Sequence, residues 1–87
     1  MDSLELAKRI RIHSLKMANR GGGSHIGSSL SIADILAVLY SDILKYDIRN
    51  PQWPNRDRFI LSKGHAALAL YCTLYEKNFI TKNTLDS

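Results

Sequence analysis

The chain has 87 residues, of which 45% are hydrophobic and 23% are charged, and its net charge is +4. This length holds one small domain at most, and the hydrophobic fraction excludes an intrinsically disordered chain. Charged residues such as Asp34, Asp42 and Lys63 interrupt the apolar runs well short of the roughly 20 residues that a membrane span needs, so we expect a soluble protein without a signal peptide.

The first predicted element is a helix over about residues 4–19, with Asp2 or Ser3 as its N-cap. Three glycines at 21–23 end it. His13 belongs to the apolar stripe of this helix, so we expect a packed histidine there rather than a catalytic one. The stripe consists of Leu6, Ile10, His13 and Met17.

A second helix is predicted from Ser31, its expected N-cap, to about Leu44. Apolar side chains recur at offsets typical of one helix face. These are Ile32, Ile35, Leu36, Leu39, Tyr40, Ile43 and Leu44.

After a loop rich in Pro and Asn, the run 58–62 is short and apolar, which predicts a buried parallel strand. A third helix is predicted over 66–77, apolar almost all round. The order is thus helix, helix, strand, helix. One strand cannot form a sheet, so the expected fold class is α/β with an incomplete sheet, whose other strands lie elsewhere.

The loop 21–29 combines four glycines, three serines and His25 directly before the second predicted helix. Glycines let the backbone approach a ligand, and a helix start attracts anions, so a polar or anionic ligand could dock here. The alternative is an ordinary loop in which glycine and serine cap the two helices. The spacing from Gly22 to Gly27 imitates a P-loop, but Ser28 stands in place of the required lysine.

The run 59–66 ends a predicted strand, turns at Gly64 and enters a helix whose first turn contains His65. Ligands of open α/β sheets bind beyond the carboxyl ends of strands, where a helix start favours phosphate. Lys63 and His65 could contact such a phosphate. The alternative is a solvated lysine beside a capping histidine.

At these segments the chain resembles thiamine-diphosphate enzymes of the transketolase group, most closely the N-terminal subunit of split bacterial transketolases. The matching motifs occur in the family's order and cover nearly the whole chain, so residues 1–87 resemble the start of the diphosphate-binding domain. The motifs are Gly23-Ser24-His25-Ile26-Gly27, Ala33-Asp34-Ile35-Leu36, Asn50-Pro51-Gln52-Trp53-Pro54-Asn55-Arg56-Asp57-Arg58 and Ser62-Lys63-Gly64-His65.

Two departures from the family pattern qualify the resemblance. Ile26 replaces the proline usual in transketolases, and the related deoxyxylulose-phosphate synthases carry an aliphatic residue there. The chain also contains no Asp-Gly pair, so the family's Gly-Asp-Gly…Asn segment, which holds Mg²⁺ and the diphosphate, is not in it. We therefore expect no metal ligands in these residues.

The resemblance implies transfer of a two-carbon ketol unit from a ketose phosphate to an aldose phosphate, with thiamine diphosphate and Mg²⁺ as cofactors. By the same resemblance His25 contacts the substrate as the catalytic residue, and His65 with Gly64 and Ser62 binds the cofactor diphosphate. The remaining transketolase segments or a C-terminal subunit would complete a homo- or hetero-oligomer. Alone, the chain is expected to be inactive.

The rival interpretation is a small basic helical module that binds nucleic acid or a protein partner, or an enzyme of the deoxyxylulose-phosphate-synthase type. Excess positive charge permits an anionic partner. A helix-turn-helix needs a short turn between its helices, whereas a long loop and a predicted strand separate the second and third helices here, so nucleic acid is not favoured. The lone Cys72 excludes a disulfide framework, and a cytoplasmic location is expected.

Overall fold

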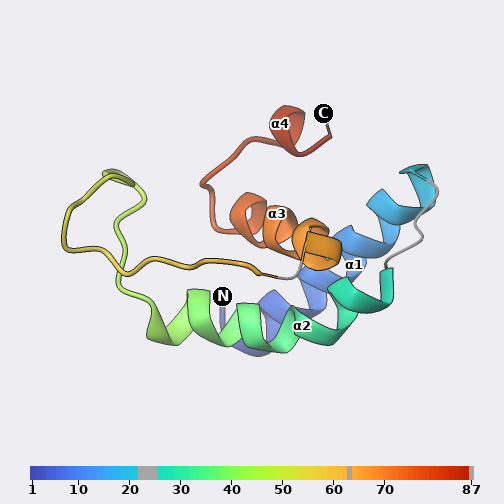
Figure 1. The fold of residues 1–87 in the computed structure, drawn as a ribbon, viewed down its shortest axis with the longest axis horizontal. Helices are drawn as coiled ribbons and strands as arrows, with labels where there is room; N and C mark the ends of the chain where they lie inside the picture. The colour runs from blue at the N-terminus through green and yellow to red at the C-terminus, as the bar shows by residue number, and fades with distance from the viewer. Residues whose placement is uncertain (22–25, 63, 87) are drawn as a thin grey trace.

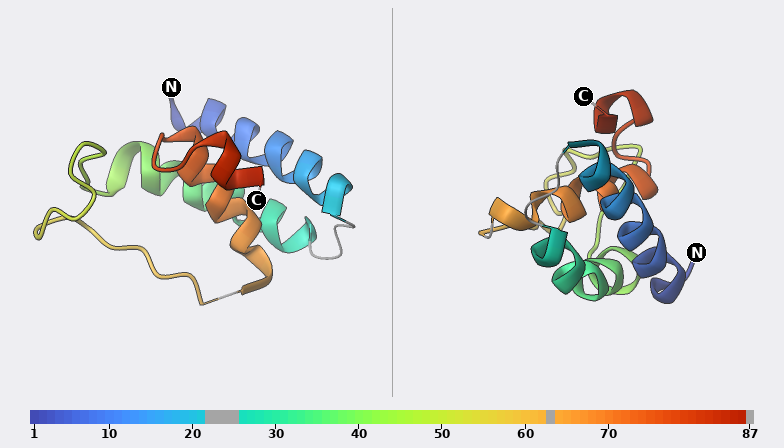
Figure 2. Two further views of the ribbon diagram at one scale, coloured as in Figure 1. Left: turned by 90° about the horizontal axis from the view of Figure 1, so that it is seen from above. Right: turned by 90° about the vertical axis from the view of Figure 1, so that its right-hand side faces the viewer.

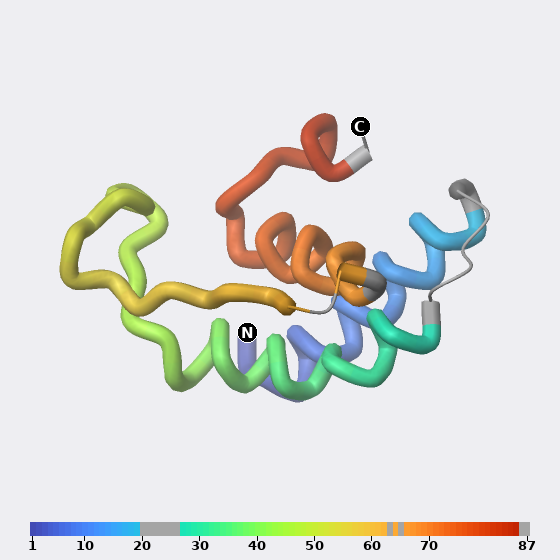
Figure 3. Tube along the Cα trace, in the orientation of Figure 1, coloured from blue at the N-terminus to red at the C-terminus, as the bar shows by residue number. Residues whose placement is uncertain are grey.

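The computed structural model describes residues 1–21, 26–62 and 64–86, and none of these residues lies in a β-strand (Figure 1). Helices α1, α2 and α3 pack against one another in pairs (Figures 1 and 2). Figure 3 shows that a long loop leaves the end of α2 and returns toward the start of α3. The elements are α1 (Ser3–Gly21), α2 (Ile26–Val38), the π-helical turn η1 (Leu39–Ile43), the 3₁₀ turn η2 (Gly64–Ala66), α3 (Ala67–Glu76) and α4 (Lys82–Asp86).

Helix α1 confirms the first prediction and runs slightly further at both ends. The backbone N–H of Glu5 donates to the Asp2 carboxylate at 2.8 Å, so Asp2 is the N-cap. Leu6 and Ile10, one turn apart on the predicted stripe, are fully buried. The cap and the stripe therefore act together to define where α1 begins and which face it presents to the core.

Helix α2 corrects the second prediction in two respects. It begins at Ile26, and Ser31 lies inside it with its hydroxyl donating to the carbonyl of Ser28 at 2.9 Å, so Ser31 is not the N-cap. The buried face is also rotated from the one expected, because Ile35 and Ile43 are each 59% exposed. The alanines on the buried face let α2 approach the neighbouring helices more closely than isoleucines in their place would. The buried residues of this face are Ser29, Ala33, Leu36, Ala37 and Tyr40.

The core lies where α1, α2 and α3 meet. Five of its members are small, four alanines and a cysteine, which lets helix axes approach closely. Two buried hydroxyls are hydrogen-bonded within it, since Thr73 donates to the carbonyl of Ala69 at 2.8 Å and Ser14 to the sulfur of Cys72 at 3.8 Å. The core cluster comprises Leu6, Ala7, Ile10, Ala33, Leu36, Ala37, Tyr40, Ala69 and Cys72.

The end of α2 is a wide turn that is held by the following loop. The N–H of Leu44 donates to the carbonyl of Leu39 at 2.8 Å, which is the five-residue spacing of a π-helix. Lys45 and Asp57 then exchange two hydrogen bonds, from the Lys45 N–H to the Asp57 carboxylate and from the Asp57 N–H to the Lys45 carbonyl, both at 2.7 Å. These two bonds attach the returning loop to the end of the helix.

The predicted strand 58–62 is not confirmed, because these residues have no regular secondary structure. No backbone hydrogen bond joins them to any other described residue, and Ile60 is 85% exposed. A strand exists only when a neighbouring strand completes its hydrogen bonds, and the described residues supply no such neighbour. The backbone N–H and C=O groups of residues 58–62 therefore have no backbone partner among the described residues.

The third predicted helix is confirmed as α3, which η2 precedes, while the short helix α4 was not predicted. α3 buries Ala69, Cys72 and Thr73 and exposes Tyr71, so it is covered on one side only. Within the described part of the chain, no helix combines the length and the apolar character needed to cross a membrane.

Ile60→Lys is expected to lower self-association of the chain about tenfold or more. The unpaired segment 58–62 offers free backbone groups and an exposed isoleucine to a second copy, and a lysine at a strand edge opposes such pairing. Sedimentation velocity over a concentration series measures the effect. Ile35→Lys, at an exposed helical position, is the matched control and should leave association unchanged. A wild-type chain that stays monomeric throughout would contradict this expectation.

Candidate cofactor-binding site

Two helices begin beside each other on one side of the molecule. The turn η2, through which the chain enters α3, packs against α2, and Figures 1 and 2 show it next to the start of α2. Neither α2 nor α3 has an acidic residue in its first turn, and α3 has no side-chain cap. Both helix starts therefore carry a positive partial charge that no carboxylate of their own first turn offsets, which suits an anionic ligand.

Glycines keep the space in front of these helix starts open. A Cβ atom added at Gly27 or at Gly64 would meet no other atom within 4 Å. Both residues are exposed. A ligand can therefore approach the backbone at the first turn of α2 and at η2 without displacing a side chain.

Ser29 adds a buried polar group in the first turn of α2. Its side chain is 1% exposed, and its hydroxyl has no hydrogen-bond partner among the described residues. A buried hydroxyl without a partner costs roughly 1 to 3 kcal/mol, so an added acceptor within its reach would be stabilised. The sequence analysis counted this serine among the polar residues of the loop 21–29, either near a docked ligand or as a helix cap.

The structure describes some of the predicted site residues and not others. Ser62 is exposed at the end of the unpaired segment, and Gly64 opens η2. His65 lies within η2, so its backbone stands beside the start of α2. His25 and Lys63 lie outside the described residues, and the structure does not test their predicted roles or that of the His65 side chain.

His13 confirms the prediction of a packed histidine. Its Nε2 atom lies 2.6 Å from a carboxylate oxygen of Glu76, and its ring meets Tyr75 edge-on at 5.3 Å. Arg9 reaches the other oxygen of Glu76 at 3.4 Å and also pairs with Glu5 at 3.1 Å. Because the Glu76 side chain is only 8% exposed, this cluster ties α1 to α3 and has a structural role.

Asp34, part of a family-like motif, pairs with Arg11 of α1. Two hydrogen bonds of 3.1 and 2.9 Å join the guanidinium to the carboxylate. The hydrogen bond lowers the pKa of Asp34 below its ordinary value and raises the pKa of Arg11. The pair therefore contributes fully above the ordinary aspartate pKa and is lost as the pH falls through the lowered value. It links α1 to α2 at the surface.

Cys72 is unsuited to nucleophilic chemistry in this structure. Its side chain is fully buried, and burial raises the pKa of the thiol above 9.0. The attacking species of a cysteine nucleophile is the thiolate, which this environment disfavours. Across the residues described, no three His, Cys, Asp or Glu side chains gather as they would around a metal ion.

Comparison with known proteins gives a consistent result. The family model described as "Transketolase, thiamine diphosphate binding domain" matches residues 3–84. An uncharacterised transketolase family protein, y4mO of Sinorhizobium fredii, is 45% identical over 83 residues, which are 95% of this chain and 30% of that protein. The 6-deoxy-6-sulfo-D-fructose transketolase subunit SqwG of a Clostridium species is 42% identical over 87 residues, all of this chain and 32% of that protein.

A longer relative has a similar identity to this chain, but the matched residues are a smaller share of its length. Transketolase 1 of Escherichia coli is 41% identical over 71 residues, which are 82% of this chain and 11% of that protein. The chain thus spans about a third or less of the curated relatives to which it is similar.

Proposed function

This chain belongs to the transketolase family, in its thiamine diphosphate binding domain, and we propose that it is one part of an enzyme that transfers a two-carbon ketol unit. The observation that carries the proposal is that α2 and η2, neither of which has an acidic residue in its first turn, lie beside each other where the matching motifs occur. Sugar phosphates, a ketose donor and an aldose acceptor, are the proposed substrates.

The residues around the helix starts fit a diphosphate. Backbone N–H groups at the start of α2 and at η2 would donate to its oxygens, and the open space at Gly27 and Gly64 admits it. We assign Ser62, Gly64 and His65 to cofactor binding, with the His65 imidazole donating a charge-assisted hydrogen bond to the diphosphate.

Thiamine diphosphate, when bound, supplies the carbon nucleophile and the electron sink that breaking a carbon–carbon bond requires. The protein's task is to orient the substrate and to stabilise the charge that develops on its oxygen. We assign this to His25, whose position in the Gly-Ser-His motif precedes the start of α2 directly. An imidazole there would donate a hydrogen bond to the substrate oxygen.

The remainder of the enzyme must supply what this chain lacks. We propose that a segment outside these residues carries the Asp and Asn ligands of Mg²⁺, since the sequence has no Asp-Gly pair. We also propose that residues 58–62 pair as a strand with that segment, because their backbone groups are free to do so. The relatives described above have transketolase names, which favours transketolase over the synthase alternative.

Reconstitution tests the proposal. The chain is produced together with the remaining segments of a split transketolase, and ketol transfer from a ketose phosphate to an aldose phosphate is followed with thiamine diphosphate and Mg²⁺. Activity is expected only when both parts are present. Calorimetry on the chain alone should give a dissociation constant for thiamine diphosphate far weaker than micromolar. An equally active preparation without this chain, or micromolar binding by the chain alone, would contradict the proposal.

His65→Ala is expected to raise the dissociation constant of thiamine diphosphate in the reconstituted enzyme about 10- to 150-fold, because a charge-assisted hydrogen bond is lost. Turnover should largely recover at saturating cofactor. The matched control is His13→Gln, which can still donate to Glu76 and should leave the constant unchanged. Slower turnover without weaker cofactor binding would show that His65 acts in the chemical step instead.

A further inference from the structure

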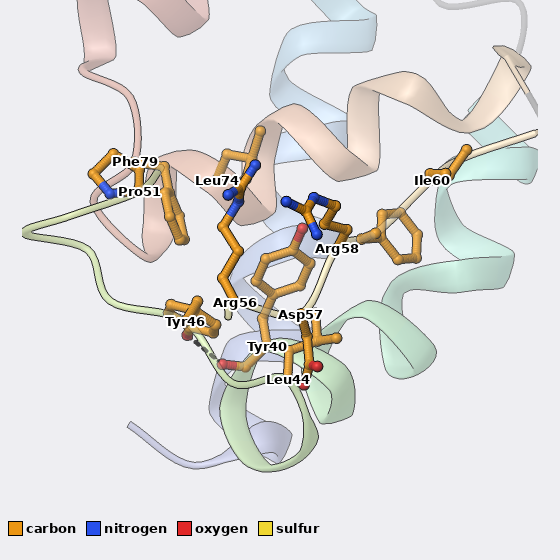
Figure 4. Close-up of a pocket in the computed structure, with 11 residues that line it drawn as sticks. Tyr40, Leu44, Tyr46, Pro51, Arg56, Asp57, Arg58, Ile60, Leu74 and Phe79 are labelled. Carbon is orange, nitrogen blue, oxygen red and sulfur yellow. Dashed lines mark hydrogen bonds between the residues drawn. The ribbon is translucent and has the colours of Figure 1, made fainter. Parts of the chain in front are cut away.

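A cavity of about 340 Å³ lies at the end of α2 opposite to the candidate cofactor site (Figure 4). The turn η1, the loop that follows it and the end of α3 surround the cavity. Its wall is mainly apolar, as in most sites for small molecules. The largest lining side chains are those of Tyr40, Tyr46, Phe59 and Phe79, with Leu44 and Leu74 between them.

The aromatic residues form a connected wall. The ring of Tyr40 lies 6.1 Å from that of Phe59 and 6.3 Å from that of Phe79, both edge-on, and Tyr46 lies 5.2 Å from Phe79. The hydroxyl of Tyr46 donates to the Tyr40 carbonyl at 2.5 Å, which holds the two tyrosines together. A flat apolar group can therefore pack against rings whose positions are already set.

Two arginines bring positive charge to this wall. In Figure 4 the guanidinium groups of Arg56 and Arg58 both lie toward the hydroxyl end of Tyr40. Neither forms an ion pair with a described carboxylate, and Arg56 donates only to the Trp53 carbonyl at 2.9 Å. Arg58 is exposed at the cavity and has no hydrogen-bond partner among the described residues.

Asp57, between the two arginines, does not neutralise them by pairing. Its carboxylate accepts the N–H of Lys45 at 2.7 Å and its own N–H donates to the Lys45 carbonyl. These two hydrogen bonds attach Asp57 to Lys45, shortly after the end of η1. The structure thus presents, beside an aromatic wall, two guanidinium groups that form no ion pair with a described carboxylate.

We propose that this cavity binds a small organic anion, a phosphate or carboxylate carried on a flat apolar body. The body would lie against Tyr40, Phe59 and Phe79, and the anion would accept hydrogen bonds from Arg58 and Arg56. A guanidinium donates two parallel hydrogen bonds to such an anion, and these are stronger than neutral ones. Because the cavity and the candidate cofactor site lie at opposite ends of α2, the ligand would be distinct from the cofactor diphosphate.

The test uses the purified 87-residue chain, kept dilute, and ligand-observed NMR with phenyl phosphate as the probe. Benzoate distinguishes a carboxylate from a phosphate, while inorganic phosphate and phenol supply the anion and the ring separately. Phenyl phosphate or benzoate is expected to bind at least tenfold more tightly than either part alone. Arg58→Ala should weaken that binding about 10- to 100-fold, since charge-assisted hydrogen bonds are lost.

The matched control is Arg49→Ala, which removes an exposed loop arginine that does not line the cavity. It should leave binding unchanged. Phe59→Leu provides a second variant that keeps both arginines and should weaken binding of phenyl phosphate without affecting inorganic phosphate. The proposal is overturned if no aryl anion binds, if inorganic phosphate binds as tightly as phenyl phosphate, or if Arg49→Ala and Arg58→Ala have equal effects.

Discussion

His25→Ala in the reconstituted enzyme is expected to lower kcat or kcat/KM by a factor on the order of 10², while the dissociation constant of thiamine diphosphate stays nearly unchanged. An imidazole that donates to a substrate oxygen contributes most when charge develops on that oxygen, so its loss affects the transition state more than the bound cofactor. Steady-state kinetics at saturating cofactor, with the ketose phosphate varied, measures the effect.

The comparison with His65→Ala makes this expectation specific. The two histidines are assigned to different parts of the complex, so one variant should change turnover and the other cofactor affinity. If His25→Ala abolished cofactor binding and His65→Ala slowed only turnover, the two roles would have to be exchanged. If neither variant changed anything, the family's fold would be present without these residue functions.

Leu6→Ala is expected to lower the free energy of unfolding by about 2 to 5 kcal/mol. Leu6 is completely buried where α1 meets the other helices, so the substitution removes apolar contacts and leaves a cavity. An 87-residue domain has a total stability of roughly 4 to 13 kcal/mol, so this loss is a large part of the whole. Urea unfolding followed by circular dichroism measures it.

Leu15→Ala is the matched control for Leu6→Ala, because it removes the same atoms from the same helix at a position that is 51% exposed. The control should change the unfolding free energy by less than about 0.5 kcal/mol. Equal losses for the two variants would show that the packing of α1 differs from the one described.

Helix α1 was predictable because its signals are local. Asp2 lies three residues before the N–H that it caps, and Leu6 and Ile10 are one turn apart. α3 was predictable for a similar reason, as an unbroken apolar run. The turn at Gly64 and the start of a helix after it were also predictable, because the glycine and the apolar helical run are adjacent in the sequence.

The errors in α2 come from a preference for large side chains. Ile35 and Ile43 fit the apolar pattern but are exposed. Alanine contributes little to such a pattern, yet it permits the closest helix packing. Ala33 and Ala37 are fully buried instead. Ser31 looked like an N-cap because serine favours that position, but the weakly patterned residues before it continue the helix back to Ile26.

Contacts between residues far apart in the chain could not be predicted from local sequence patterns. His13 and Glu76 are far apart in the chain, and nothing in the local pattern pairs them. The cavity is lined by residues from η1, the long loop, α3 and Phe79, so it exists only once the loop has returned. The strand predicted at 58–62 is not confirmed, because the described residues include no second strand with which it could form hydrogen bonds.

The wide turn at the end of α2 has a consequence for the order of folding. The Leu44 N–H goes to the Leu39 carbonyl and the Lys45 N–H goes to Asp57, so neither of the usual helical donors reaches the carbonyl of Tyr40, which accepts the Tyr46 hydroxyl instead. The last turn of α2 therefore cannot complete its hydrogen bonds until the loop closes and brings Asp57 back. Closing the loop from Lys45 to Asp57 carries an entropic cost, so we expect this last turn to form after the local hydrogen bonds within α2.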